Sequence, residues 1–147
     1  MVFIRHCFIF FIGNPLVQIF PVPVLIEELN KAEKFIFMEY FIIQEGKMWN
    51  AVLDIMKEKA AAGVDVRLMM PGIPDHWFAY QVAQSYFPEL TGHHVKIYTF
   101  TPGLIHGKTV MVDREAAFVG SVNMDFRSFQ LHFECGELLY RMPAIES

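Results

Sequence analysis

The chain has 147 residues, a formal net charge of −4 and a hydrophobic fraction of 54%. This length predicts one domain, large enough to bury a core without disulfides. No run of lysines and arginines is present, so the sequence lacks the basic patch typical of proteins that bind nucleic-acid backbones. Cys7 and Cys135 are too few and too far apart for a disulfide framework or a zinc site, which favours a reducing compartment.

Residues 7–26 carry no charge and have the length of a membrane span. Gly13, Asn14 and three prolines interrupt the run, and each proline inside a helix costs about 3 kcal/mol, so we expect no transmembrane helix. No small-residue cleavage site follows, which argues against a secretory signal. We therefore expect residues 1–26 to form an irregular apolar segment, able to touch a membrane surface, and residues 27–147 to form one domain.

The rest of the chain alternates between patterns typical of helices and of strands. Helical patterns cover residues 24–33, 47–62 and 76–87, the last with Asp75 as N-cap, and 123–130 is a short helix or loop. Strand patterns cover residues 34–43, 64–70, 95–100, 106–113, 115–121 and 131–140. Strand, helix and strand in succession predict a βαβ unit with parallel strands. We predict an α/β fold with a mixed, mostly parallel sheet and helices on both faces.

Residues 104–128 place many polar side chains in a segment that otherwise has the pattern of buried strands. Alternate strand residues share a face, so His106 and Lys108 should point the same way, and Asp113 the other way to brace backbone or an arginine. Ser121 and Asn123 form a second pair of this kind. If the two strands are neighbours, an imidazole, an ammonium, a hydroxyl and an amide converge. That set suits a phosphodiester, because the donors neutralise phosphate oxygens while the imidazole attacks phosphorus.

These residues also carry a family resemblance. "HGKTVMVD" fits the H-x-K-x4-D pattern of the phospholipase D superfamily, and "GSVNMDFRS" follows at the spacing that this superfamily uses. Residues 34–140 resemble bacterial cardiolipin synthases, and the part from "MPGIPD" onward resembles their second repeat. The resemblance implies a phospholipase D-type fold and transfer of a phosphatidyl group between phosphatidylglycerol molecules, through a phosphohistidine.

The resemblance also implies a role for each motif residue. His106 would be the catalytic histidine, while Lys108 and Asn123 would bind the phosphate. Ser121 would add a hydrogen bond, and Glu134 would hold the histidine in its working tautomer. Asp113 belongs to the catalytic motif by its position, although strand alternation favours a bracing role for it. No metal and no cofactor are implied.

The chain departs from the family in one respect. The synthases carry two H-x-K-x4-D motifs, whereas this chain has one. Its first part looks like the beginning of their first repeat, so the two likenesses meet near residues 64–72, which we interpret as an internal deletion or recombination. Because the chemistry needs a nucleophile and a general acid, we expect pairing with a second copy, or with a full-length synthase, that supplies another histidine.

Two other interpretations remain open at this point. A homodimeric phosphodiesterase acting on nucleic acid would also use a single motif, but the acidic net charge argues against it, and we expect no nucleic-acid partner. An inactive remnant that only associates with membrane or with a full-length synthase would fit the apparent recombination. The first interpretation predicts a phospholipid substrate and a location at the bacterial cell membrane.

Overall fold

The elements of the chain alternate between strands and helices, as the patterns predict. The structure is a computed structural model, and it describes residues 6–12, 22–73, 77–130 and 134–146. In chain order, the described elements are β1 (His6–Ile12), α1 (Val22–Lys31), β2 (Phe35–Glu39), α2 (Lys47–Ala61), β3 (Asp65–Pro71), α3 (Trp77–Ser85), α4 (Phe87–Gly92), β4 (Lys96–Phe100), β5 (Thr109–Val112), β6 (Ala116–Gly120), α5 (Phe126–Gln130), β7 (Glu134–Tyr140) and α6 (Pro143–Glu146).

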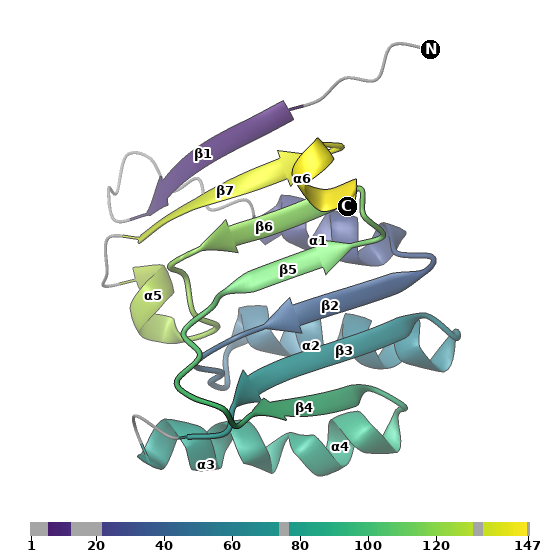
Figure 1. The fold of residues 1–147 in the computed structure, drawn as a ribbon. Helices are drawn as coiled ribbons and strands as arrows, with labels where there is room; N and C mark the ends of the chain where they lie inside the picture. The colour runs from purple at the N-terminus through teal and green to yellow at the C-terminus, as the bar shows by residue number, and fades with distance from the viewer. Residues whose placement is uncertain (1–5, 13–21, 74–76, 131–133, 147) are drawn as a thin grey trace.

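The described strands form one mixed sheet in the order β1-β7-β6-β5-β2-β3-β4 (Figure 1). The α/β class is confirmed, and so is the βαβ unit, because β2 and β3 are parallel. β3 and β4 are also parallel, but the other pairings between the described strands are antiparallel, so the expectation of a mostly parallel sheet is wrong. Parallel neighbours need a crossover connection, whereas the tight turn between β5 and β6 can only join antiparallel strands.

The large helices lie on one face of the sheet rather than on both. α1 and α2 run side by side behind the strands in Figure 1. α4 joins that layer, because the rings of Trp49 and Tyr86 meet at 5.6 Å and Lys57 pairs with Glu89 at 2.8 Å. Strands β2, β3 and β4 are added in one direction, so right-handed crossovers place both connections on the same face. Helical cover on both faces is therefore not found over these strands.

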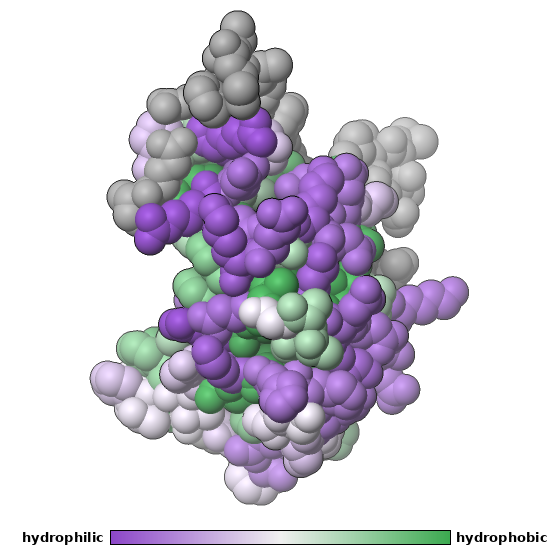
Figure 2. Space-filling model, turned by 90° about the vertical axis from the view of Figure 1, so that its right-hand side faces the viewer, coloured by the Kyte–Doolittle hydropathy of each residue, from purple (hydrophilic) through white to green (hydrophobic). Residues whose placement is uncertain are grey.

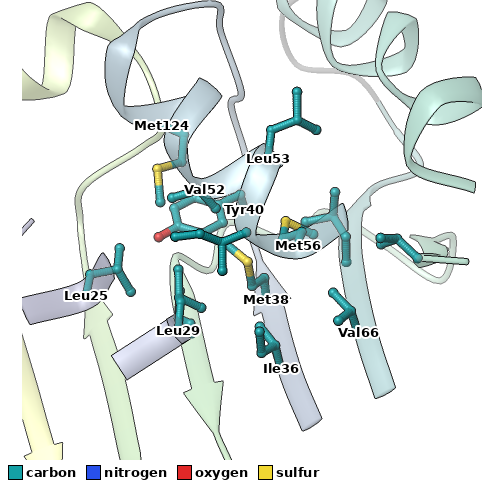
Figure 3. Packing of buried hydrophobic residues seen from close by; sticks show 14 of the residues in the cluster. Leu25, Leu29, Ile36, Met38, Tyr40, Val52, Leu53, Met56, Val66 and Met124 are labelled. Atoms are coloured by element: carbon teal, nitrogen blue, oxygen red, sulfur yellow. The ribbon is translucent and has the colours of Figure 1, made fainter. Parts of the chain in front are cut away.

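The hydrophobic core fills the space between this helical layer and the sheet (Figure 3). β2 alternates between half-buried and buried residues, with Ile36 and Met38 facing the helices. Leu29 of α1 and Met56 of α2 pack against them and are fully buried. Burying a side chain of this size stabilises the fold by about 1.5–3 kcal/mol. Met124, from the loop before α5, enters the same cluster and so ties the end of β6 to the core.

The apolar start of the chain enters the fold in two pieces. Residues 6–12 pair with β7 in antiparallel register, and α1 begins at Val22. The expected division between an irregular segment 1–26 and a domain 27–147 is therefore wrong, since α1 crosses it. Pro23 lies in the first turn of α1, where its missing N–H is not needed. None of the described helices is long and apolar enough to cross a membrane.

A second proline also begins a helix where an end was expected. The helix predicted over residues 76–87 is two helices, α3 and α4. Pro88 lies in the first turn of α4, a position that proline favours, so the helical backbone continues to Gly92. The expected N-cap, Asp75, lies outside the described residues.

The end of the sheet at which β2, β3 and β4 begin has a mostly hydrophilic surface (Figure 2). Asp65 lies there, 2.8 Å from the ammonium of Lys96 and 3.0 Å from Nε of Arg67. These two cations, Arg67 first, lower the pKa of Asp65 from 3.8 to about 2. Asp65 is therefore more acidic in the folded chain, so it stabilises the fold above its ordinary pKa, and this contribution is lost as the pH falls towards 2.

We expect Asp65→Asn to reduce the difference in stability between neutral pH and pH 2. Exposed pairs are screened, so the effect is at most about 1 kcal/mol and shrinks in high salt. Urea unfolding of both proteins at the two pH values measures it. Glu58→Gln, at an exposed position of α2, is the matched control. A variant that loses as much stability as the wild type on acidification would contradict the assignment.

Candidate functional site

The ends of four strands meet at one edge of the sheet, opposite the hydrophilic end (Figure 1). β5 and β7 begin there, whereas β6 and β2 end there, because neighbouring strands in this part of the sheet are antiparallel. His106 and Lys108 immediately precede β5, while Ser121 and Asn123 follow β6. A hydrogen bond from the N–H of Gly120 to the carbonyl of Lys108, 3.1 Å long, joins the two segments. The fold thus brings both polar pairs to one place.

The side chains of His106 and Lys108 are in contact. The ammonium nitrogen of Lys108 lies 2.9 Å from Nδ1 and 3.0 Å from Nε2 of His106, and it donates to the carbonyl of His106 at 2.9 Å. Lys108 is only 6% exposed, whereas His106 is exposed. The two side chains therefore point the same way, as alternation predicts, with the imidazole accessible and the ammonium beneath it.

The surroundings of Lys108 set two effects against each other. Burial disfavours a charged ammonium and lowers the pKa of Lys108. The carboxylates of Glu134, Glu39 and Asp125 oppose that effect and favour the charged form. An ammonium held in this way is a strong donor for an anion such as a phosphate, because little water competes with it.

Ser121 and Glu134 form a second contact at this edge. The hydroxyl of Ser121 donates to the carboxylate of Glu134, which is buried, and accepts from the N–H of Cys135 at 3.1 Å. The N–H of Ser121 in turn donates to the carbonyl of Cys135 at 2.9 Å. Glu134 is thus fixed beside Ser121 at the start of β7, and its expected role as the partner of His106 remains a proposal.

Asn123 is held by a hydrogen bond from Ile42, in the segment that follows β2. Its side-chain oxygen accepts from the N–H of Ile42 at 3.2 Å, and its own N–H donates to the hydroxyl of Ser128 at 3.2 Å. The N–H of Ser128 donates to the carboxylate of Asp125 at 2.8 Å, which makes Asp125 the N-cap of α5. Ser128 was missed by sequence reasoning, although an acidic residue three positions before it is a recognisable N-cap signal.

Glu39, the last residue of β2, and Phe41, which follows the strand, also belong to the site, although no sequence pattern pointed to either. The ring of Phe41 meets the ring of His106 edge-on with 4.4 Å between centroids, and the ammonium of Lys108 lies 5.2 Å from the Phe41 centroid. Glu39 contributes charge, as described above. Both lie in an apolar run that predicts a central strand, and the motif is more than sixty residues away along the chain.

Asp113 is not part of this cluster, because it lies at the opposite end of β5. Its carboxylate accepts from the N–H groups of Glu33, Lys34 and Phe35 at 2.6, 2.9 and 2.7 Å. Asp113 and Arg114 both have positive φ, 52° and 58°, as the two central residues of a type I′ turn require. The third member of the motif thus fastens the β5–β6 turn to the start of β2, which agrees with the expected bracing role.

The described residues contain no group of three or more His, Cys, Asp or Glu side chains arranged to hold a metal ion. The polar groups of the site are therefore an imidazole, an ammonium, a hydroxyl, an amide and several carboxylates. Such a set can bind and attack a phosphoryl group by nucleophilic and electrostatic catalysis.

Comparison with known proteins agrees with this chemistry. Residues 25–146 match the family described as "Cardiolipin synthase, PLD-like domain". The chain belongs to this family. It is 41% identical over 123 residues to a cardiolipin synthase of Listeria monocytogenes, covering 82% of this chain but 24% of that protein. The chain therefore spans about a quarter of the length of the curated relatives that it matches.

Solved structures show the same fold at low sequence identity. Nuc from Salmonella typhimurium, a phospholipase D family member, matches with a TM-score of 0.70 and 17% identity, over 96% of this chain and 86% of that chain. Phosphatidylserine synthase from Haemophilus influenzae matches with a TM-score of 0.68 and 13% identity, over 99% of this chain and 37% of that chain. The phospholipase D fold expected from the motif is confirmed.

We expect Asp113→Ala to lower the free energy of unfolding by about 2 kcal/mol or more, because it removes a charged acceptor shared by three N–H groups. Asp113→Asn should cost less, since its single side-chain oxygen can still accept from Lys34 and Phe35. Urea unfolding monitored by circular dichroism should show the free energy of unfolding decreasing from the wild type to Asp113→Asn and then to Asp113→Ala. Equal stability of the alanine variant and the wild type would contradict a bracing role.

Proposed function

We propose that the chain is a phosphatidyltransferase of the cardiolipin synthase type, which moves a phosphatidyl group between phosphatidylglycerol molecules at a membrane surface. The observation that carries this proposal is the contact between an exposed imidazole, His106, and a buried ammonium, Lys108. Membership of the cardiolipin synthase family supports the choice of substrate.

The reaction consists of two displacements at phosphorus. A ring nitrogen of neutral His106 attacks the phosphodiester, the N–P bond forms, and the P–O bond to glycerol breaks while that oxygen takes a proton from a general acid. A hydroxyl of a second phosphatidylglycerol then attacks phosphorus and loses its proton to a base, and the N–P bond breaks. The imidazole is regenerated, and the products are cardiolipin and glycerol.

The other residues of the edge have roles that follow from their chemistry. Lys108 and Asn123 bind the non-bridging oxygens, which requires the ammonium to exchange its contact with the His106 ring for one with phosphate. Ser121 adds a hydrogen bond and holds the carboxylate of Glu134 in place. Glu134 stabilises the charge near His106 and keeps its ring in the tautomer that attacks.

The general acid has to be a second group that can release a proton near neutral pH. Among the histidines whose side chains the structure describes, His93 and His94 lie in the turn between α4 and β4, at the far end of the sheet. We therefore propose that a second copy of the chain, or a full-length synthase, places its histidine opposite His106. A two-fold pairing would bring identical edges together.

We expect His106→Ala to abolish transfer, with a loss of at least about a thousandfold, because the nucleophile is removed. The purified chain is offered phosphatidylglycerol vesicles and, separately, plasmid DNA, and the products are analysed by thin-layer chromatography and gel. His93→Ala is the matched control. Cardiolipin formed by the wild type and the control alone supports the proposal, whereas nicked DNA without cardiolipin indicates a nuclease, and no turnover of either indicates an inactive remnant.

We expect the active species to have twice the mass of the chain when no other protein is present. Light scattering at micromolar concentration, combined with the activity assay on the same fractions, measures this. A stable monomer that forms cardiolipin would rule out the need for a second copy.

A further inference from the structure

The last residue of β2 carries a carboxylate directly beneath the motif. Glu39 lies opposite Thr109 in the antiparallel register of β2 and β5, and its side chain is half-buried. A Cβ added to Gly107 would collide with Oε1 and Cδ of Glu39, so the carboxylate rests on the α-carbon of Gly107. The residue between His106 and Lys108 is therefore a glycine for a spatial reason, since any larger side chain would displace Glu39.

None of the described residues holds Glu39 in place by an ion pair. Within the part of the chain that the structure describes, its carboxylate has no ion-pair partner within 4.0 Å. Its neighbours on the same face of β2, Phe35 and Phe37, are apolar and stack on each other at 4.3 Å. A half-buried carboxylate without an ion pair is stabilised by a positive charge nearby.

That charge is the ammonium of Lys108. Three carboxylates act on it from three elements: Glu39 from β2, Asp125 from the N-cap of α5, and Glu134 from β7. Asp125 is already engaged by the N–H of Ser128, and Glu134 by the hydroxyl of Ser121. Glu39 therefore differs from the other two, because its contact is with the backbone of the motif itself.

We propose that Glu39 is a positioning residue, which supports the His106–Gly107–Lys108 segment and keeps Lys108 as an ammonium ready to bind phosphate. The role in phosphate binding rests on the proposed function. The effect of Glu39 on the charge of Lys108 does not depend on that function and can be measured without a substrate. Glu39 acts through Gly107 and Lys108 and does not touch the substrate. The end of β2 and the residues after it thus supply the ring of Phe41 and the carboxylate of Glu39 to a site whose motif lies elsewhere in the chain.

The first test measures the protonation of Lys108 without any ligand. Carbon-13 NMR of the lysine side-chain carbons, assigned with Lys108→Arg, follows the titration of Lys108 in the full chain. Glu39→Gln keeps the shape and removes the charge, and it should lower the pKa of Lys108 by about half a unit or more. Glu58→Gln, on the exposed face of α2, should leave it unchanged. An unchanged pKa in Glu39→Gln would overturn the inference.

The second test moves the carboxylate without removing it. Gly107→Ala should push the flexible end of Glu39 aside and lower the pKa of Lys108, as Glu39→Gln does. In a Glu39→Ala background, where the added methyl group has room, Gly107→Ala should have little further effect. Equal shifts from Gly107→Ala with and without the side chain of Glu39 would show that the glycine acts independently and would overturn the assigned role.

Binding of inorganic phosphate separates this inference from the proposed function. Calorimetry across the alkaline range should show phosphate affinity falling with deprotonation of Lys108, and the midpoint of that fall should move to lower pH in Glu39→Gln. A wild type that binds no phosphate at any pH, while Lys108 still responds to Glu39→Gln, would refute the phosphoryl-transfer site and leave the charge coupling standing. A wild type that binds phosphate with the same pH midpoint as Glu39→Gln would refute the positioning role alone.

Discussion

A buried lysine is the constraint on which the site depends. Taking the ammonium of Lys108 out of water is costly unless opposite charges and hydrogen bonds surround it. The chain supplies a carbonyl and an imidazole at 2.9–3.0 Å, and carboxylates from three separate elements. Each of those groups must lie at the same edge of the sheet, so the order and direction of the strands determine which groups surround Lys108.

The directions of β2, β5, β6 and β7 bring these groups together. β5 and β7 start where β6 and β2 end, so residues before two strands and after two others meet at one edge. The right-handed crossovers place α1, α2 and α4 behind the sheet, and the site lies at the strand ends, away from that layer (Figure 1). Asp113 contributes at a distance, because it fixes the β5–β6 turn to the start of β2 and thereby the register that puts Glu39 opposite Thr109.

Residues 64–72, where the resemblance to the first repeat meets the resemblance to the second, lie largely in a regular strand. Residues 64–72 correspond largely to β3, which pairs in parallel register with β2 on one side and β4 on the other. Its buried positions, among them Val66 and Leu68, belong to the same core as α1 and α2. The sheet is therefore continuous at this place, because β3 satisfies the hydrophobic pattern and the register that a central strand requires.

The amino-acid sequence alone predicts the α/β class, the βαβ unit and the pairing of His106 with Lys108, because hydrophobic period and strand alternation are local properties. It could not determine that most pairings are antiparallel, since strand order depends on contacts between distant segments. It could not connect Glu39 and Phe41 to the motif either, for the same reason. The carboxylates that surround Lys108 can be identified only in the folded chain, because electrostatic interactions depend on distance in space and not on separation along the chain.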